Sequence, residues 1–321
     1  MTAPDGTGGL VTLGETMGLV AAAETGPLEF ARAFGYGIGG AESNVAIGAA
    51  RLGAPVTWIG RVGSDATGDM IERRLRAEGV RTVVVRDPGF TGLMVKHRRF
   101  GSTLSVDYHR AGSAGSRLSP DDLPAGCVET AGVLHVTGIT PALSRSAHDA
   151  VFHAVERARA AGVPVSVDVN YRRKLWSPDE ARPVLRRLVA LADAVFAGVE
   201  EARLVLGPDG AGTAAELVGP LSELGPAQAV IKDGARGCTA RIDGTGYRLA
   251  ALPVTAVDPV GAGDAFVAGY LAELLAGECA EQRLRTAIAA GAYAVSVPGD
   301  CEGLPRRTEL AALTGAEDVV R

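Results

Sequence analysis

Short apolar runs rich in β-branched residues recur along the chain and alternate with longer segments of mixed polarity. The clearest of these runs cover residues 10–13, 55–59, 133–136, 164–169 and 229–231. Runs of this length, bounded by glycine, proline and polar residues, are typical of buried strands. Their alternation with helical segments predicts the α/β fold class.

The longer segments show the three-to-four-residue spacing of amphipathic helices. In residues 65–78, Ile71 and Leu75 lie four positions apart, while glutamate and arginine occupy the other faces. Gly79 follows, and a glycine can end a helix in the left-handed conformation at little steric cost. Residues 146–161 repeat this arrangement and are also followed by a glycine. The pattern predicts one helix in each segment.

Two stretches interrupt this alternation of strands and helices. Residues 15–36 and 89–112 both have strand and turn patterns without an intervening helix. We expect them to form one small β element that lies over the main domain as a lid, entered by a hairpin-like crossing at the turn of residues 87–89. The sequence has no internal repeat and no low-complexity linker, so we expect a single domain over residues 1–321.

The overall composition narrows the class of protein. The 321 residues are 47% hydrophobic and carry a formal net charge of −5, so the chain can form a large core but has no positive field that would hold nucleic acid. No stretch reaches the roughly 20 apolar residues that cross a bilayer, so we expect no membrane partner. The four cysteines are scattered, which favours a reducing compartment and hence the cytoplasm.

The strongest chemical signal lies at residues 258–266, at the start of a predicted helix. Gly261, Ala262 and Gly263 have little or no side chain, so the backbone there can approach an anion. The free amides of a helix N-terminus would point at the same anion. Asp264 would be unfavourable beside a phosphate unless it has a role, and we expect it to accept the proton of an attacking hydroxyl.

Other interpretations of these motifs are open at this point. Asp264 could be only the cap of its helix. A P-loop is excluded, because no Gly-x4-Gly-Lys-Ser/Thr motif occurs in the sequence. Gly35, Gly37 and Gly40 have the spacing of a dinucleotide-binding motif, but the residues before them do not form a buried-strand pattern, so an oxidoreductase has little support.

Two motifs resemble the signatures of the ribokinase-like sugar kinases, the PfkB carbohydrate kinases. The positions that resemble them are residues 258–269 near the C-terminus and, near the N-terminus, residues 39–46 and 51–53, Gly60, Val62, Gly63, Asp65, Gly68, Leu75 and Gly79. The resemblance covers nearly the whole chain. It implies a mostly parallel central sheet with helices on both faces, a β-sheet lid, and transfer of a phosphoryl group from ATP to a sugar hydroxyl.

The resemblance also implies roles for residues at the phosphate end. Gly261, Ala262 and Gly263 would form an anion hole, in which Gly261 and Gly263 also contact the nucleotide, and Asp264 would be the catalytic base. Glu201 is similar to the family's acidic residue that orients Mg²⁺ through water, although Gly198 stands where the family has asparagine. Family members often bind a monovalent cation such as K⁺ close to the position of Asp258. The positions that resemble the family's nucleotide loop are Lys232, Gly234 and Gly237.

The sugar end favours an acidic substrate. Leu19 stands where fructokinase-like members have an aspartate that holds sugar hydroxyls, so a neutral hexose is less favoured. Tyr108, Arg110 and Arg172 lie in segments that we expect to face the substrate. A guanidinium matches a carboxylate in shape and charge. Residues 173–174, beside Arg172, could equally form a solvated basic turn.

The same segments resemble the 2-keto-3-deoxygluconate kinases, which phosphorylate the terminal 6-hydroxyl of their substrate. Residues 138–140 and 299–305 add to this resemblance. It implies that Gly39, Gly40 and Asn44 lie at the sugar, with Asn44 bonded to its hydroxyls. Asn44 could instead be a simple helix cap.

Some alternatives are open from the sequence alone. The enzyme could be a fructokinase, a ribokinase or a 5-dehydro-2-deoxygluconokinase, and acids derived from gluconate and galactonate differ only in the configuration of a hydroxyl. A sensor that binds sugar or nucleotide without turnover is an alternative of another class, but it would be expected to lose the base or the anion hole, and both are retained. We expect a homodimer or a higher homo-oligomer, because open β edges on a lid can pair across a two-fold axis.

Overall fold

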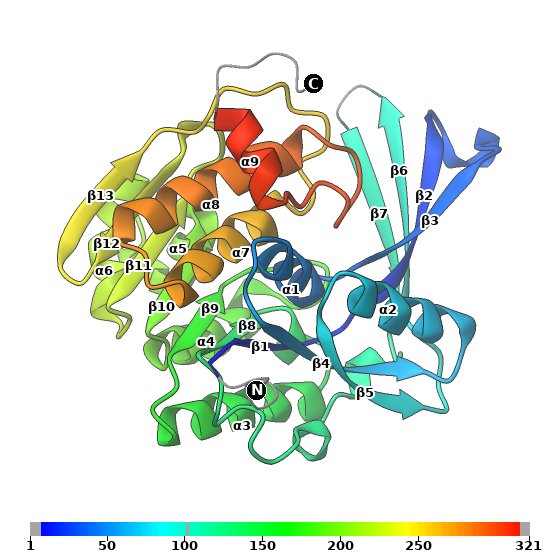
Figure 1. The fold of residues 1–321 in the computed structure, drawn as a ribbon, viewed down its shortest axis with the longest axis horizontal. Helices are drawn as coiled ribbons and strands as arrows, with labels where there is room; N and C mark the ends of the chain where they lie inside the picture. The colour runs from blue at the N-terminus through cyan, green and yellow to red at the C-terminus, as the bar shows by residue number, and fades with distance from the viewer. Residues whose placement is uncertain (1–7, 101–102, 315–321) are drawn as a thin grey trace.

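The computed structural model describes residues 8–100 and 103–314, which form two separate sheets (Figure 1). In spatial order, the large sheet contains β13 (Thr245–Leu249), β12 (Cys238–Ile242), β11 (Gln228–Lys232), β10 (Ala194–Gly198), β9 (Val165–Asp168), β8 (Val133–Thr137), β1 (Leu10–Leu13), β4 (Val56–Gly63) and β5 (Arg81–Asp87). All neighbours from β11 to β5 pair in parallel, and only β12 and β13 are antiparallel. The predicted α/β fold class is confirmed.

Helices cover both faces of the large sheet (Figure 1). One face carries α1 (Ala41–Arg51), α2 (Ala66–Ala77), α7 (Ala262–Leu275), α8 (Ala280–Val295) and α9 (Arg307–Thr314), and the other carries α3 (Arg145–Ala160), α4 (Pro178–Ala190), α5 (Val199–Leu206) and α6 (Ala214–Glu223). Successive strand residues point to opposite faces, so Phe196 packs with α7 while its neighbour Val195 packs with α4, α5 and α6. None of the helices in the described ranges has the length and apolar character to cross a bilayer.

The two helices predicted in detail are confirmed, with their bounds shifted by one residue. The side chain of Asp65 accepts a hydrogen bond from the Gly68 amide (2.8 Å) at the start of α2. Gly79 follows the helix with φ of +81°, the left-handed conformation expected of it. Ser144 caps α3 in the same way by accepting from the Ala147 amide (3.1 Å). Side-chain acceptors of this kind satisfy amides that the helix leaves unpaired.

The small sheet is built from both stretches that interrupt the alternation. Its strands, in spatial order, are β3 (Phe34–Gly39), β2 (Met17–Thr25), β6 (Leu93–Phe100) and β7 (Thr103–His109). Strand β3 continues to Gly39, three residues past the predicted end of its segment. Because β5 belongs to the large sheet and β6 to the small one, the turn at residues 87–89 carries the chain between sheets. The chain therefore crosses into the small β element at this turn, as predicted, and β5 and β6 do not pair with each other.

The parallel strands bring distant parts of the chain to one edge of the large sheet. Strands β1, β8, β9, β10 and β11 all end at this edge, because parallel strands point the same way. Ligands of open parallel sheets bind beyond the carboxyl ends of the strands. The small sheet extends from this edge, since β2 follows β1 after three residues.

Candidate active site

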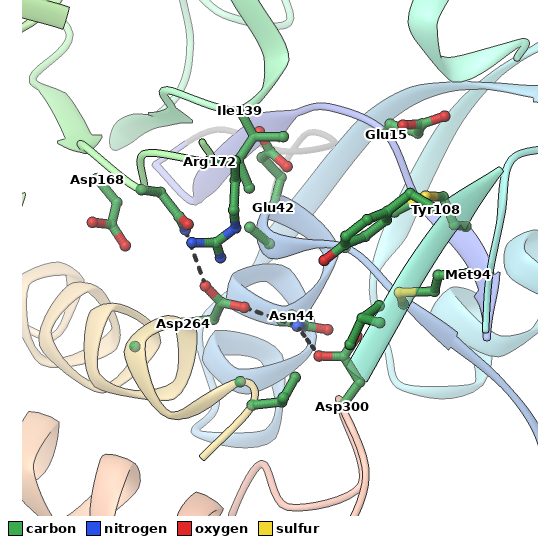
Figure 2. A pocket seen from close by; sticks show the side chains of 18 of the residues that line it. Glu15, Glu42, Asn44, Met94, Tyr108, Ile139, Asp168, Arg172, Asp264 and Asp300 are labelled. Carbon is green, nitrogen blue, oxygen red and sulfur yellow. Dashed lines mark hydrogen bonds between the residues drawn. The ribbon is translucent and has the colours of Figure 1, made fainter. Parts of the chain in front are cut away.

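A cavity of about 400 Å³ lies where the carboxyl ends of the parallel strands meet the small sheet (Figure 2). Its wall includes residues of β2, β6 and β7 and the beginnings of α1 and α7. Ten of the predicted site residues line it: Gly40, Asn44, Tyr108, Arg110, Arg172, Glu201, Lys232, Gly261, Gly263 and Asp264. The other five, Gly39, Ala262, Gly234, Gly237 and Asp258, lie in the same segments but do not line the wall. The fold therefore gathers the predicted residues around one space.

The start of α7 has the geometry of an anion-binding backbone. Gly261 adopts φ of +77°, and a side chain there would bring Cβ to 2.4 Å from the Asp300 carbonyl oxygen, so only glycine fits. No side chain caps this helix. The first intrahelical bond runs from the Ala265 amide to the Gly261 carbonyl (2.8 Å), which leaves the preceding amides free to bind a ligand at the positive end of the helix dipole.

Asp264 lies in the first turn of α7 and is not its cap, since the N-cap is Gly261. Its carboxylate faces the cavity and accepts a hydrogen bond from Asn44 Nδ2 at 2.8 Å. Asn44 Nδ2 also donates to Asp300 Oδ1 at 2.9 Å, and these three side chains lie in a row in Figure 2. Asn44 is therefore no helix cap either. Asn170 Nδ2 donates to the other oxygen of Asp264 at 3.4 Å.

Burial raises the pKa of both carboxyl groups of this row, Asp264 and Asp300. Removal from water is the largest cause that raises the pKa of Asp264 to about 7, and the nearby Asp300 adds to it. The Asn44 hydrogen bond and the charge of Arg172 act in the opposite direction. Burial also raises the pKa of Asp300 to about 6. A carboxyl group with a pKa near 7 can hold or release a proton at neutral pH, as a general base must.

The two arginines expected at the sugar differ in their surroundings. Arg110 donates from Nε (2.7 Å) and Nη2 (2.6 Å) to Glu15 Oε2, and Ser113 donates to the other oxygen of Glu15. The guanidinium of Arg110 is thus already paired with a buried carboxylate. Arg172 makes no ion pair with any carboxylate in the described part of the chain, and Figure 2 shows its guanidinium directed toward Asp264. Of the two, Arg172 is the one available to a substrate anion.

The small sheet gives the cavity an apolar wall and an aromatic ring. Met17 and Leu19 of β2 pack with Met94 of β6, and all three line the cavity. The Tyr108 ring lies beneath two cations, with Arg110 at 5.6 Å from its centroid and Lys174 at 5.7 Å. Lys174 also donates to the Val106 carbonyl (2.7 Å) of β7, so it ties its loop to the small sheet and is not part of a freely solvated turn.

Gly39 and Gly40 allow the backbone between β3 and α1 to pass close to other groups. A Cβ on Gly39 would lie 1.8 Å from Asp300 Oδ2, and a Cβ on Gly40 would lie 2.4 Å from the Glu15 carbonyl oxygen. Neither contact is possible for a larger residue. These glycines position Asn44, four and five residues later, against the two carboxyl groups.

At the other end of the cavity lie the residues that resemble a nucleotide loop. Lys232 Nζ binds both oxygens of Asp168 (2.9 and 2.8 Å). Burial alone would lower the pKa of Lys232, but the charge of Asp168 raises it, so the ammonium stays charged. Gly234 and Gly237 form the turn after β11 with φ of +56° and +95°. A Cβ on Gly237 would lie 2.0 Å from the Leu249 carbonyl oxygen, so this glycine serves the packing of the turn on β13.

Glu201 lines the cavity at the start of α5, where its carboxylate also has a structural role. It accepts hydrogen bonds from the amides of Tyr171 (2.9 Å) and Gly198 (2.6 Å). These donors hold each oxygen in place and leave further lone pairs for water. In the described residues, no group of three His, Cys, Asp or Glu side chains could hold a metal by itself.

Asp258, expected close to a monovalent cation, is buried and already paired with an ammonium group. Lys96 Nζ of β6 lies 2.6 Å from Asp258 Oδ2 and 2.8 Å from the Gly299 carbonyl oxygen. Lys96 was not among the predicted site residues, because a lysine in an alternating strand is typically a surface residue.

Five further polar residues that line the cavity were not among the predicted site residues: Glu15, Glu42, Asp168, Asn170 and Asp300. Asp300 and Asn170 stand within segments that resemble the family, but nothing local indicates that their side chains meet at Asp264. Glu42 is 1% exposed, and its carboxylate accepts hydrogen bonds from Thr137 (2.7 Å) and Thr140 (2.6 Å), while burial raises its pKa. The sequence feature that could have identified Glu42 is its position as a charged residue in the first turn of a helix that is otherwise buried.

Curated relatives share this chain's full length. A 2-dehydro-3-deoxygluconokinase of Bacillus subtilis is 37% identical over 97% of this chain and 96% of its own. One of Thermoproteus tenax is 39% identical over 94% and 92%, and a 2-dehydro-3-deoxygalactonokinase of Haloferax volcanii is 35% identical over 91% and 92%.

Solved structures show the same architecture. A PfkB protein of Polaromonas sp. superposes with a TM-score of 0.86 at 36% identity, covering 95% of this chain and 99% of its own. A putative ribokinase of Escherichia coli in complex with ATP and Mg²⁺ gives 0.87 at 27% identity, covering 95% and 98%. A fructokinase of Vibrio cholerae with bound fructose, ADP and potassium gives 0.84 at 26%, covering 97% and 100%.

The family comparison covers nearly all of the described residues. The family model described as pfkB family carbohydrate kinase matches residues 8–307. This range includes both sheets and every residue that lines the cavity. Together with the relatives' identities over more than nine-tenths of the chain, this match establishes that the chain belongs to the pfkB family of carbohydrate kinases.

Proposed function

We propose that this enzyme transfers the γ-phosphoryl group of ATP to the terminal 6-hydroxyl of 2-keto-3-deoxygluconate. The observation that carries the proposal is the position of Asp264. This carboxyl group has a pKa near 7 and lies beside the free amides at the start of α7, in a cavity lined by an arginine that forms no ion pair within the described residues. The relatives named as 2-dehydro-3-deoxygluconokinases, a synonymous name, support this choice of substrate.

The geometry suggests how the chain's own residues act on the acceptor. A sugar hydroxyl placed within hydrogen-bond distance of Asp264 would pass its proton to the carboxylate as its oxygen attacks the γ-phosphorus. The bond from phosphorus to the bridging oxygen of ADP breaks, and ADP leaves with the electron pair. The amides of Gly261, Ala262 and Gly263 would stabilise the negative charge on the phosphoryl oxygens. Asn44 would orient Asp264 and bind a sugar hydroxyl.

Arg172 supports an acidic acceptor. Its guanidinium is free of carboxylate partners in the described residues and enters the cavity from the large sheet side. Leu19, Met17 and Met94 present no hydrogen-bonding group to a sugar from the opposite wall. A substrate carboxylate would then pair with Arg172, whose charge also acts on Asp264, while the acceptor hydroxyl would lie near Asp264.

We further propose that ATP binds with Mg²⁺ and that Glu201 orients the ion through water. Mg²⁺ commonly keeps several waters and relies on phosphate oxygens, which fits a chain whose described residues offer no cluster of three metal-binding side chains. When bound, the ion would neutralise charge on the β- and γ-phosphates. Lys232, 3.5 Å from a Cβ built on Gly263, would contact the same phosphates.

A panel of acceptors tests the proposed function. With ATP and Mg²⁺, ADP release should be fastest with 2-keto-3-deoxygluconate, and kcat/KM for fructose or ribose should be lower by about 10-fold or more, because a charge-assisted hydrogen bond contributes about 1.5–3 kcal/mol. The galactonate isomer and 5-dehydro-2-deoxygluconate belong in the panel. A preference for fructose would contradict the proposal, and sugar binding by calorimetry without ADP release would point to a sensor.

We also propose that the small sheet serves as a lid and joins two copies of the chain in the cytoplasm. Strands β3 and β7 are its open edges. Large apolar side chains are exposed on or beside its strands: Phe30 (71%), Phe34 (47%), Tyr36 (53%) and Phe100 (69%). Pairing of such surfaces across a two-fold axis would cover them. Light scattering should report twice the monomer mass, and a monomer at micromolar concentration would contradict this arrangement.

The proposed cytoplasmic location is supported by the cysteines. All four are free, which suits a reducing compartment.

A further inference from the structure

A lysine from the small sheet reaches into the loop that precedes the anion-binding amides. Lys96 lies on β6, and its Nζ contacts Asp258 Oδ2 at 2.6 Å and the Gly299 carbonyl oxygen at 2.8 Å. The side chains of this pair are 8% and 3% exposed. A charge is buried to this extent only when it is paired, because its removal from water is costly. The ion pair between Lys96 and Asp258 is therefore a structural feature of the folded chain and not an incidental surface contact.

The pair joins two loops that shape the phosphate end of the cavity. Asp258 Oδ1 accepts from the Val260 amide (3.1 Å), and Asp258 Oδ2 also accepts from the Gly299 amide (3.4 Å). Gly261 follows Val260 and lies against the Asp300 carbonyl, where a Cβ would approach to 2.4 Å. The ammonium thus bridges the segments on both sides of the anion-binding turn, and it neutralises the carboxylate that orders them.

A related fructokinase of Vibrio cholerae has a bound potassium ion, and the resemblance places a monovalent cation near Asp258. The residues of this chain do not fit a second cation there. Lys96 already supplies one positive charge to Asp258, and Arg98 of the same strand donates from Nη2 to the Val257 carbonyl (2.9 Å). Besides Asp258, the carboxyl group of Asp300 also feels the charge of Lys96. An added K⁺ would face two cations in a site with little access to water.

We infer that the ammonium group of Lys96 takes the place of the monovalent cation, so that phosphoryl transfer by this chain requires no K⁺. An ammonium is a compact charge with three donors, and here it contacts one carboxylate and one carbonyl, groups that also bind K⁺. Since Lys96 belongs to the small sheet, the cation is supplied by the element that forms the sugar wall. The activity part of this inference rests on the proposed function, whereas the part on cation binding does not.

Two measurements on the unaltered chain test the inference. Turnover with ATP, Mg²⁺ and 2-keto-3-deoxygluconate is compared in potassium, sodium and tetramethylammonium chloride at equal ionic strength, and we expect kcat to agree within about 2-fold, because screening alone is then constant. The thermal midpoint Tm should likewise be the same in potassium and tetramethylammonium chloride. A K⁺-specific rise in Tm or a rise in kcat of about 10-fold or more would overturn the inference, since a ligand that binds the native state stabilises it.

The variant Lys96→Ala should become dependent on a monovalent cation. Without K⁺, we expect kcat and Tm both to fall, with kcat lower by about 10-fold or more, because a buried carboxylate loses its partner. Potassium should restore part of both values, and tetramethylammonium, which is too large for the space of an ammonium, should restore neither. If potassium has no effect on a folded Lys96→Ala protein, the idea that a cation site lies beneath Lys96 is wrong.

The matched control is Arg98→Ala, which removes another contact between β6 and the same loop but keeps the ammonium on Asp258. Its kcat and Tm should show no specific response to potassium. A potassium response as large as that of Lys96→Ala would mean that any weakening of the sheet creates the effect, and would contradict the inference.

Should Lys96→Ala fail to fold, the Tm of the unaltered chain in the two salts still tests whether the native state binds potassium. A chain that transfers no phosphoryl group in any salt would refute the proposed function, while its Tm would still test cation binding.

Discussion

Replacement of Asp264 by asparagine should lower kcat by roughly 10² to 10⁴, the range typical for loss of a general base. Asparagine has nearly the same shape and can keep the contact with Asn44 by accepting through its amide oxygen, so the sugar and ATP should still bind with little change in affinity. What is lost is the acceptor for the proton of the attacking hydroxyl. Steady-state ADP release and calorimetric binding of both substrates measure the two quantities separately. Near-normal turnover would contradict the assigned role.

The pH dependence gives this prediction an internal control. The pKa of Asp264 is raised from 3.8 to about 7 by burial, so kcat/KM of the wild type should rise as the pH passes about 7, and the residual rate of Asp264→Asn should lack this step. Stability should change in the opposite sense. The neutral carboxyl group contributes stability that is fully present below about pH 4 and lost as the pH rises through about 7. Asparagine cannot ionise, so Asp264→Asn should unfold at a higher Tm than wild type at pH 8, with the difference diminishing toward pH 4.

Replacement of Arg172 by alanine should raise KM for 2-keto-3-deoxygluconate by about 10- to 100-fold, because a hydrogen bond to a charged group contributes about 1.5–3 kcal/mol. KM for ATP should change little, since Lys232 and the amides at the start of α7, the groups proposed to contact the phosphates, are unaltered. Initial rates over a grid of both substrates give the two constants.

Arg173→Ala is the matched control for this variant. Arg173 is its neighbour in sequence and is equally charged and likewise exposed, but it does not line the cavity around Asp264. Its sugar KM should stay within about 2-fold of wild type, as is usual for exposed positions. An unchanged sugar KM in Arg172→Ala, or an equal rise in both variants, would remove the argument that a single arginine binds the substrate carboxylate.

The two arginines show where sequence reasoning reaches its limit. Arg110 and Arg172 both follow strand-like segments and both enter the cavity. Only the order of the small sheet, in which β6 lies between β2 and β7, brings Arg110 after β7 onto Glu15 before β2, 95 positions away. No pattern of neighbouring residues indicates a contact between positions so far apart. The sequence therefore predicts both arginines as candidates for binding the substrate carboxylate, and the structure shows which one is already paired.

Sequence periodicity was sufficient for most of the secondary structure. Helix α2 has its apolar stripe, its aspartate cap and its terminal glycine within one short segment, and all of these signals act between near neighbours. The turn after β5 was correctly predicted to carry the chain into the small β element, but a turn motif does not specify which strands the next strand pairs with.

The amino-acid sequence by itself determined the alternation of strands and helices, the glycine-rich start of α7, and the placing of Asp264 in its first turn. Such features depend on backbone freedom and periodicity over a few residues. Only the tertiary structure decided that Asn44 meets Asp264 across 220 positions and Asp300 across 256, and that Lys96 reaches Asp258 across 162. The physical reason is that these contacts, and the pKa that burial gives Asp264, depend on the order of the strands and on the position of the small sheet beside the large one.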